Sequence, residues 1–321
     1  MKDTVLILGI TGQDGITLAK SYLKRDYNVI GTSRDIANSR FNHIFSRFSS
    51  KKLKLIEINQ LDWEKVAELI KTYQPKYIFN LIGPSSVFDS FSRPYHYYHF
   101  IYLNVLYFLE AIRLYSKKDI RFFNAGSTDC FGDNGRKIVT ESTEFKPLSP
   151  YAYSKVSACN LVKSYRENHD IFCVNGYLSN HESKLRPKTF IIPKIIHTAH
   201  DIAWGKEKKL SIGNIDISRD WGWSEDYMEA CQRIIEAETP SDYIVCTGVT
   251  TSLRSVIKNA FDFHNLDYKK YIEIDKSLLR TNEIKNIRLS PNKINRNLKW
   301  KATKKIKEII KILSENLIKT N

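Results

Sequence analysis

A tyrosine and a lysine four positions apart have the types and spacing that acid/base chemistry needs. Tyr151 and Lys155 stand near the start of a predicted helix that runs to about Glu167. On a helix, residues four positions apart share one face. A lysine beside a tyrosine lowers the pKa of the phenol and makes it a usable proton donor and acceptor. Alone, the same spacing is most often a solvated surface pair.

A serine earlier in the chain strengthens this interpretation. Ser127 follows an apolar strand predicted over Arg121 to Ala125, so it stands at a strand end. Its hydroxyl can hydrogen-bond the same substrate hydroxyl as Tyr151 and pass on its proton. Because a glycine loop also precedes them, Ser127, Tyr151 and Lys155 are predicted to form a catalytic set.

The glycine loop lies at the chain start and predicts dinucleotide binding. It follows an apolar strand predicted over Thr4 to Leu8 and precedes a helix predicted over Ile16 to Leu23. Glycines allow a tight turn and close backbone approach, and the helix N-terminus offers N–H groups and a positive dipole to a pyrophosphate. We assign these loop residues to cofactor binding: Gly9, Thr11, Gly12, Gln13, Asp14 and Gly15.

The end of the second predicted strand, Asn28 to Gly31, indicates which dinucleotide binds. An acidic residue there would hold the ribose 2′-hydroxyl of NAD. Here Arg34 comes first, and its guanidinium suits a 2′-phosphate. Asp35 follows directly, and its alternative role is a turn residue in a salt bridge. The sequence therefore favours NADP over NAD.

The elements that position these residues alternate between strands and helices. Short apolar strands alternate with helical patterns in the first half of the chain, which predicts a doubly wound parallel sheet covered by helices on both faces. The further strands are predicted over 53–58 and 77–82, and the further helices over 63–73 and 97–115.

After about residue 178 the alternation becomes irregular, and we predict a second, smaller lobe of mixed α/β structure. A helix at about 225–237 and a strand at 243–246 are expected to rejoin the sheet. We therefore assign 1–178, with a return segment of about 215–248, to the dinucleotide-binding domain, and 179–214 and 249–321 to the lobe. The tail, Lys299 to Lys319, is predicted as an amphipathic helix that packs on this lobe.

Composition excludes several classes of protein. Of the 321 residues, 42% are apolar and 26% charged, as in a globular protein with a large core. The five cysteines are scattered without a CxxC pair, which argues against a zinc site or disulfide framework and predicts a reducing, cytoplasmic location. No apolar run approaches the roughly 18 residues of a membrane span. Met1 to Leu8 is too short for a signal-peptide core. We expect no metal site.

These residues together resemble the extended short-chain dehydrogenase/reductases, and within them the GDP-mannose 4,6-dehydratase family. The resemblance covers nearly the whole chain. Its specific motifs are Ile10–Gly15, Asn175–Ser183, Gly213–Asp216 leading into Arg219–Gly222, and Arg280–Glu283. The Asn-His-Glu-Ser and Arg-Asp-Trp-Gly runs are much more specific than the glycine loop.

The resemblance implies a GDP-sugar substrate and a tightly held NADP. Such enzymes oxidise the C4 hydroxyl, remove the C5 proton with a carboxylate, lose water from C6 and return the hydride to C6. The product is a 4-keto-6-deoxy sugar, as used in deoxysugar and polysaccharide biosynthesis. By position, Asp129 would be the carboxylate and Leu81 would contact the cofactor. Substrate contacts would come from Ser85, Thr128, Asn180, Lys194, Arg219, Arg280 and Glu283.

Several positions depart from the family pattern. Asp129 stands where the family has Glu, and Ser127 where it has Thr. The segment Ile82–Val87 differs from the Ala-Ala-Gln-Ser-His-Val of the family, which points to altered sugar specificity. Asp35 replaces a second arginine and Gln60 an aspartate. The two long helices around Tyr97–Tyr115 and Tyr151–Glu167 resemble the four-helix interface of the family dimer, so we expect a homodimer, with a homotetramer as the alternative.

Three functions remain open at this point. The first is a GDP-sugar 4,6-dehydratase acting on GDP-mannose or a relative such as GDP-manno-heptose. The second is a GDP-4-keto-sugar reductase or epimerase, which needs only Ser127, Tyr151 and Lys155. The third is a non-catalytic NADP-binding protein that binds nucleic acid through its basic surface, since the formal net charge is +15. We expect no nucleic-acid or membrane partner, because two diphosphate ligands and the Lys-, Ile- and Asn-rich composition account for the charge.

Overall fold

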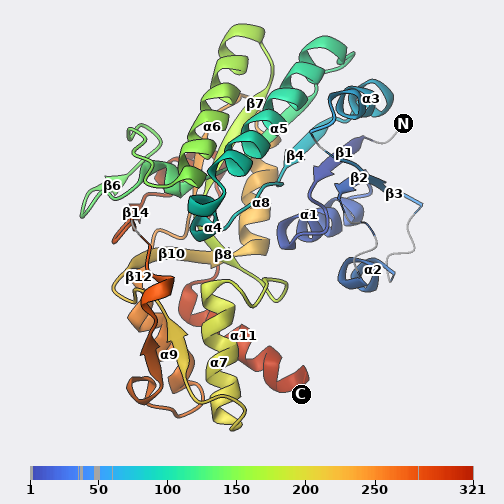
Figure 1. Ribbon diagram of the computed structural model, residues 1–321. Coiled ribbons are helices and arrows are strands. Elements are labelled where there is room, and N and C mark those ends of the chain that lie inside the picture. Colours follow the sequence, from blue (N-terminus) through green and yellow to red (C-terminus); the bar gives the residue numbers. More distant parts are fainter. Residues whose placement is uncertain are drawn as a thin grey trace. The chain divides into compact units, whose positions relative to one another are not determined.

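The computed structural model describes residues 3–34, 36, 39–46, 51–59, 61–280 and 282–320. Its main sheet has seven strands in the order β11-β7-β5-β4-β1-β2-β3 (Figure 1). The pairings from β7 to β3 are parallel. The strands are β1 (Thr4–Leu8), β2 (Asn28–Ser33), β3 (Leu53–Glu57), β4 (Tyr77–Asn80), β5 (Arg121–Ser127), β7 (Cys173–Leu178) and β11 (Tyr243–Val245). From β1 the chain adds β2 and β3 on one side and then β4, β5 and β7 on the other. Doubly wound sheets bind their ligands at the point where this direction changes, which here lies between β1 and β4.

Helices cover both faces of this sheet, so the predicted doubly wound α/β fold is confirmed. Except for the edge strand β3, the strands are buried along most of their length, and this is why they read as continuous apolar runs. The helices around the sheet are α1 (Gln13–Lys24), α2 (Ser39–Phe45), α3 (Trp63–Tyr73), α4 (Val87–Ser92), α5 (Pro94–Tyr115), α6 (Pro150–His169) and α8 (Ser224–Ile235).

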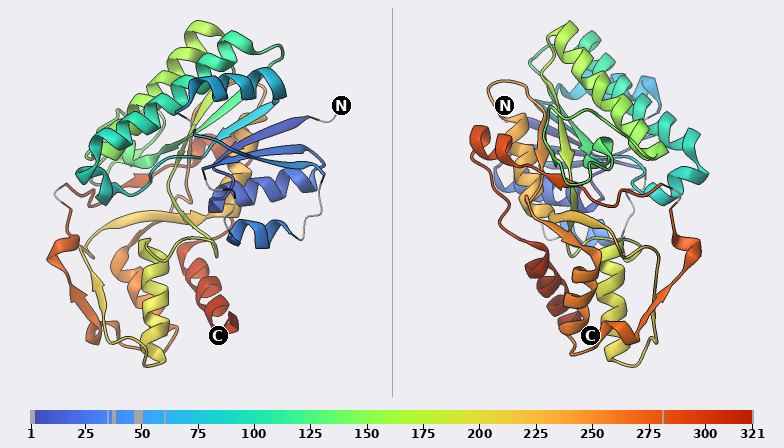
Figure 2. Two further views of the ribbon diagram at one scale, coloured as in Figure 1. Left: turned by 45° about the vertical axis from the view of Figure 1, so that its right-hand side comes forward. Right: turned by 90° about the vertical axis from the view of Figure 1, so that its left-hand side faces the viewer.

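Each face has its own core. Helices α3, α5 and α6 pack on one face in a single apolar cluster, and α5 and α6 lie side by side (Figure 2). On the other face, the ring of Tyr22 in α1 lies 5.6 Å from that of Phe79 on β4, and Phe79 lies 5.7 Å from Phe123 on β5. Ser21 Oγ donates to Gln232 Oε1 at 2.9 Å, which ties α1 to α8.

The chain divides into two compact units. The first comprises 1–130, 149–178 and 228–243, and the second comprises 131–148, 179–227 and 244–321. From the sequence we predicted a return segment of about 215–248. The second unit holds β6 (Ile138–Val139), β8 (Asn180–Glu182), α7 (Ile191–Ala203), β9 (Leu210–Ile212), β10 (Ser218–Trp223), β12 (Thr250–Ser252), α9 (Leu253–Asp262), β13 (Ile272–Ile274), β14 (Arg288–Leu289), α10 (Asn292–Leu298) and α11 (Ile306–Thr320).

The tail helix begins later than predicted. We expected it from Lys299, but α11 starts at Ile306. Lys299 adopts a left-handed conformation, with φ of 53°, and ends α10 instead. Trp300 Nε1 then donates to the Asp226 carbonyl at 3.0 Å, and the Thr303 amide donates to the Asp226 carboxylate at 2.8 Å, so this segment is held without a helix. The predicted apolar face is confirmed as buried: Ile306, Ile309, Ile310 and Leu313.

Candidate active site

Tyr151 and Lys155 lie in the first two turns of α6. The helix begins with Pro150, and Ser149 Oγ accepts the amide of Ala152 at 3.1 Å, which is a typical N-terminal cap. The cap and the proline therefore fix where the helix starts and place Tyr151 and Lys155 one turn apart. Lys155 Nζ lies 5.9 Å from the centre of the Tyr151 ring.

Lys155 is held against the sheet. Its side chain is buried, and Nζ donates to the carbonyl oxygen of Ala125 on β5 at 2.7 Å. Burial lowers the pKa of Lys155 below its ordinary value, because desolvation penalises the charged amine. The hydrogen bond to Ala125 fixes the amine two residues before Ser127, at the carboxyl end of β5.

Ser127 and Asp129 follow at the same strand end. β5 ends at Ser127, and a short 3₁₀ turn runs from Thr128 to Phe131. The Asp129 amide donates to Ser127 Oγ at 3.2 Å, which fixes the serine hydroxyl on this turn. Ser127 and Thr128 are buried, whereas Asp129 is half-buried. The four predicted catalytic residues thus come from one strand end with the turn after it, and from the helix packed on that strand: Ser127, Asp129, Tyr151 and Lys155.

Tyr97 is a neighbour of this set that the sequence analysis did not assign. Its ring meets that of Tyr151 edge-on, with centres 6.3 Å apart and planes at 86°. It is buried at the start of α5, and burial raises its pKa, while a hydrogen bond with Ser86 opposes that shift. No local motif marks Tyr97, because only the packing of α5 against α6 brings it to Tyr151.

The glycine loop has the geometry of a pyrophosphate site. Gly9 has a φ of 82°, and a Cβ on Gly15 would lie 2.3 Å from the Gly9 carbonyl oxygen. Gly12 caps α1 without a side-chain hydrogen bond, so its first-turn N–H groups are not taken by a capping side chain. Thr11 Oγ1 and Ser33 Oγ hydrogen-bond at 3.1 Å, which joins the loop to β2.

The segment after β4 borders this loop. A Cβ on Gly9 would lie 2.6 Å from Ile82 Cγ2, so the Gly9 backbone packs closely against the Ile82 side chain. The Leu81 amide donates to the Leu8 carbonyl at 3.3 Å. Ser85 is exposed just before α4, whose cap is Ser86. The structure therefore brings Leu81 to the glycine loop.

A cavity of about 560 Å³ lies beyond the ends of β2 and β3. Arg34 lines it, and its guanidinium carbon lies 5.7 Å from the centre of the Phe100 ring. Two further basic side chains, Lys65 and His96, face the same cavity together with one carboxylate, Glu57. Sequence reasoning missed Lys65 and His96 because neither stands in a motif. Asp35 and Gln60 lie outside the described residues.

Four of the predicted nucleotide contacts lie near β10 in the second unit. Arg219 is buried on β10, and Trp221 of that strand pairs with Asn180 on β8. Ser218 bridges to Asn286, which brings the 283–286 segment alongside. Arg280 Nη1 lies 3.5 Å from Glu283 Oε1.

Lys194, the remaining predicted nucleotide contact in the second unit, lies in the first turn of α7. Hydrogen bonds from Ser277 lower the pKa of Asp275, and the charge of Lys194 adds to that shift.

The Arg-Asp-Trp-Gly run contributes buried residues that hold the second unit together. Asp220 is buried and accepts the amides of Thr247 at 2.9 Å and Val249 at 3.0 Å, and burial raises its pKa. Trp221 is 2% exposed and Trp223 5%, so both are core residues. Arg219 of the same run is also buried, and its Nη1 donates to the carbonyl oxygen of Ser218 at 2.9 Å.

His181 is a hydrogen-bonded residue of the second unit. Its Nδ1 lies 2.7 Å from the Ser179 carbonyl, and its ring centre is 4.8 Å from that of Tyr227.

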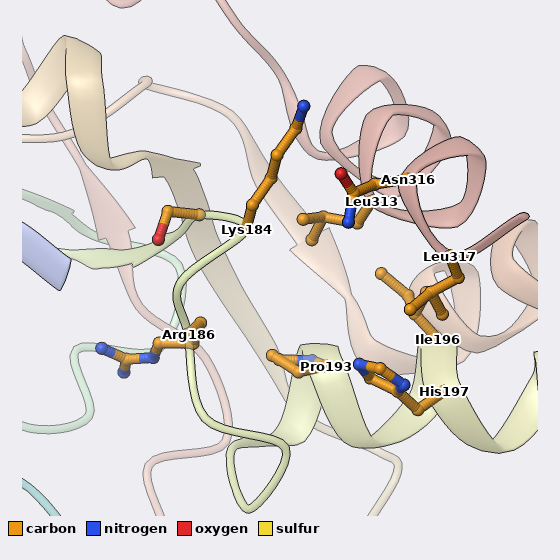
Figure 3. A pocket seen from close by; sticks show the side chains of 9 residues that line it. Lys184, Arg186, Pro193, Ile196, His197, Leu313, Asn316 and Leu317 are labelled. Carbon is orange, nitrogen blue, oxygen red and sulfur yellow. The ribbon is translucent and has the colours of Figure 1, made fainter. Parts of the chain in front are cut away.

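From the sequence alone, Lys184 and Arg186 are expected to be solvated charges, but Arg186 is partly buried and paired. Its Nε lies 3.8 Å from the Glu182 carboxylate, and its guanidinium lies over the Phe190 ring at 3.7 Å. Lys184 and Arg186 extend in different directions beside a pocket of about 30 Å³ between α7 and α11 (Figure 3). A volume of this order holds about one water molecule, so the pocket is no sugar-nucleotide site.

The fold, the glycine loop and the Ser/Tyr/Lys set define an extended short-chain dehydrogenase/reductase. A family model described as GDP-mannose 4,6 dehydratase matches residues 6–313. The chain is 32% identical over 317 residues to GDP-mannose 4,6 dehydratase 1 of Arabidopsis thaliana, covering 96% of this chain and 88% of the relative. The chain belongs to the GDP-mannose 4,6-dehydratase family and is a sugar-nucleotide 4,6-dehydratase, a hydro-lyase.

Solved structures share the fold at low identity. A dTDP-glucose 4,6-dehydratase of Bacillus anthracis in complex with NAD has a TM-score of 0.84 at 18% identity, covering 99% of this chain and 97% of that one. RMD of Pseudomonas aeruginosa, complexed with NADPH, has a TM-score of 0.79 at 20% identity, covering 100% and 99%. Among the described residues, no helix is long and apolar enough to cross a membrane.

Proposed function

We propose that this protein is an NADP-dependent GDP-sugar 4,6-dehydratase. It would convert GDP-mannose, or a close relative such as GDP-manno-heptose, to the GDP-4-keto-6-deoxy sugar with loss of water. The observation that carries the proposal is the buried Lys155, bound to Ala125 at 2.7 Å, which sets Tyr151 and Lys155 at the strand end that bears Ser127 and Asp129.

The residues present fit a dinucleotide with a 2′-phosphate. The close-packed glycine loop and the cap of α1 suit a pyrophosphate, and Arg34 and Lys65 bring positive charge to the cavity beyond β2, which Glu57 also lines, and Lys65 pairs in addition with Asp62 at 3.7 Å. Related folds have been solved with NAD and with NADPH. Bound NADP would supply the hydride acceptor for C4 and the hydride donor for C6.

The catalytic set would move the proton of the C4 hydroxyl. Tyr151 takes this proton, Ser127 hydrogen-bonds the same hydroxyl, and Lys155 holds a positive charge beside the phenol. The Ala125 carbonyl favours the charged amine of Lys155, which offsets part of the desolvation that lowers its pKa. Once C4 is a ketone, the C5 proton is acidic.

Asp129 would carry out the elimination. A carboxylate near C5 and C6 takes the C5 proton and protonates the departing C6 hydroxyl, so one group serves as base and then acid. Asp129 is half-buried on the turn after β5. The hydrogen bond that its backbone amide donates to Ser127 Oγ fixes this turn beside the catalytic set. The aspartate is one methylene shorter than the glutamate that resemblance to the family leads one to expect.

Residues of the second unit would bind the GDP moiety. Arg219 and Arg280 suit the diphosphate because guanidinium groups form paired hydrogen bonds with phosphate oxygens. Glu283 suits the ribose hydroxyls, and its ion pair with Arg280 at 3.5 Å holds both side chains in place. Further contacts are assigned to Ser85, Thr128, Asn180 and Lys194.

One experiment separates this function from its alternatives. The purified protein is incubated with GDP-mannose, and in parallel with GDP-manno-heptose, without added cofactor, and product mass is followed. Loss of one water without consumption of NADPH supports the dehydratase.

The short Asp129 side chain favours a second candidate, a GDP-4-keto-sugar reductase or epimerase. Stoichiometric oxidation of NADPH on a keto-sugar would support the reductase, and isomerisation without water loss the epimerase.

A further inference from the structure

A row of buried asparagines crosses the sheet directly behind the catalytic strand end. Asn80 on β4, Asn124 on β5 and Asn175 on β7 stand opposite one another in the strand register. Asn104 on α5 lies at one end of the row. All four are at most 3% exposed, although buried amides are costly unless they are hydrogen-bonded.

The amides of the row donate in one direction. Asn104 Nδ2 donates to Asn80 Oδ1 at 2.9 Å, and Asn80 Nδ2 donates to Asn124 Oδ1 at 3.1 Å. Asn124 Nδ2 donates to Asn175 Oδ1 at 2.9 Å, and Asn175 Nδ2 lies 3.2 Å from Asp242 Oδ2. Hydrogen bonds aligned in this way polarise and strengthen one another. The row therefore acts as one connected unit.

The row also holds the helix that bears the catalytic residues. Asn175 Nδ2 donates to the carbonyl oxygen of Cys159 at 3.1 Å, and Asn124 Nδ2 lies 3.9 Å from Cys159 Sγ. Cys159 stands one helical turn after Lys155, and Lys155 bonds to Ala125, the residue next to Asn124. Helix α6 is thus fixed to β5 and β7 at two points one turn apart beside the catalytic residues. Further along the helix, Cys173 Sγ donates to the Val162 carbonyl at 3.1 Å and Arg166 Nη1 donates to the Cys173 carbonyl at 2.8 Å.

We propose that Asn124 and Asn175 are positioning residues, which hold α6 in register so that Tyr151 and Lys155 meet the end of β5. The proposal rests on the catalytic roles in the proposed function. Apolar contacts are non-directional and would let a helix slide along the sheet. Sliding α6 would break the bond to the Cys159 carbonyl and leave buried amides unpaired, so the row penalises every other placement.

Asn124→Leu tests this role, because leucine has a similar volume and no hydrogen bonds. We expect kcat to fall about 10- to 100-fold, because small displacements of catalytic groups slow the reaction. The KM for the GDP-sugar should stay within about twofold of the wild-type value. The second readout is the pH dependence with which an amine reagent labels Lys155, followed by mass spectrometry. Its midpoint should move to lower pH, because a displaced Lys155 loses its bond to Ala125.

Val162→Ala is the matched control. Val162 is fully buried on the same helix but belongs to the apolar cluster rather than to the row. We expect it to lower the unfolding midpoint while kcat and the Lys155 midpoint stay unchanged. The proposal is overturned if Asn124→Leu leaves both quantities unchanged, or if Val162→Ala shifts them as strongly at equal loss of stability.

Two features keep the test decisive. If Asn124→Leu does not fold, Asn124→Ala removes the amide without adding volume or charge, and shifts in the same direction are expected. Failure of the proposed function is recognised separately. A wild-type protein that turns over no GDP-sugar refutes that function, whereas the Lys155 labelling midpoint still supports or overturns the positioning role.

Discussion

At the scale of single residues, chemistry depends on where a side chain is buried and what it contacts. Lys155 is buried and donates to Ala125, so its amine is desolvated and oriented at once. Asp129 is half-buried on a tight turn. Arg34 is an exposed side chain at the rim of a cavity with Lys65 and His96.

Asp129→Asn should separate the two halves of the proposed reaction. The amide keeps the shape of the side chain but cannot accept the C5 proton, so water loss should fall at least about 100-fold. Oxidation at C4 should survive and appear as NADPH absorbance after mixing enzyme with GDP-sugar. Full dehydratase activity in this variant would show that another group is the acid/base.

Arg34→Ala should change the choice of dinucleotide. A guanidinium that pairs with a 2′-phosphate contributes a charge-assisted hydrogen bond, so NADP affinity should fall about tenfold or more. Affinity for NAD should stay within about twofold, because NAD lacks that phosphate. Calorimetric titration of both dinucleotides checks this, and an equal loss for both would contradict the assignment.

At the scale of elements, short contacts set where loops and helices can lie. The glycine loop packs on itself, since a Cβ on Gly15 would lie 2.3 Å from Gly9 O. Helices α5 and α6 are joined by Glu110, which accepts from Tyr165 of α6 and pairs with Arg113 at 2.8 Å. The α11 prediction was wrong over its first turns because the contacts of Asp226 with Trp300 and Thr303 outweigh local helical preference.

Gly12→Ala and Gly15→Ala should fail in different ways. A Cβ on Gly12 would lie 3.4 Å from Gly9 O, so the apo fold should tolerate it. The added methyl would still crowd a pyrophosphate, and NADP affinity should fall about tenfold or more. Gly15→Ala should instead lower the unfolding midpoint of the apoprotein. Thermal unfolding with and without NADP distinguishes the two, and an apoprotein equally destabilised by both changes would contradict this.

Glu110→Gln should destabilise the protein in a pH-dependent way. Hydrogen bonds, first from Arg113, lower the pKa of Glu110 from its ordinary 4.5 to about 2. Its ionised form therefore stabilises the fold above pH 4.5, and this contribution is lost as the pH falls toward about 2. Urea titrations at pH 7 should show a loss of about 0.5–1 kcal/mol.

The difference between Glu110→Gln and wild type should shrink below pH 4.5. The exposed Glu68→Gln is the control, and it should leave unfolding unchanged at every pH. A difference that is constant with pH would contradict the assigned ion pair.

At the scale of the whole molecule, exposed aromatic side chains and net charge bear on which partners the protein binds. Large apolar side chains are exposed along α4, α5 and α6 in the first unit: Phe88, Phe91, Tyr95, Tyr98 and Tyr153. Resemblance to the family dimer led us to expect a four-helix interface here. We propose a cytoplasmic homodimer, with the homotetramer as the alternative, and no nucleic-acid partner for the net charge of +15.

Arginines at Tyr98 and Tyr153 should dissociate this dimer. Light scattering after size exclusion should give about twice the chain mass of 37.4 kDa for the wild type. The double variant Tyr98→Arg and Tyr153→Arg should elute as a monomer, because two added cations on each copy oppose burial. Trp204→Arg, at a similarly exposed position directly after α7, is the control and should stay dimeric. A monomeric wild type would refute the dimer.

The sequence by itself determined the doubly wound sheet, the glycine loop and the helix that carries Tyr151 and Lys155. These follow from local patterns: apolar runs, a cap at Ser149 and residues spaced along one helix. Only the tertiary structure decided which distant residues meet. It brought Lys65 and His96 to the cavity of Arg34, set Tyr97 against Tyr151, and aligned Asn80, Asn124 and Asn175 across three strands. Such contacts depend on strand register and helix packing, which no local pattern of residues encodes.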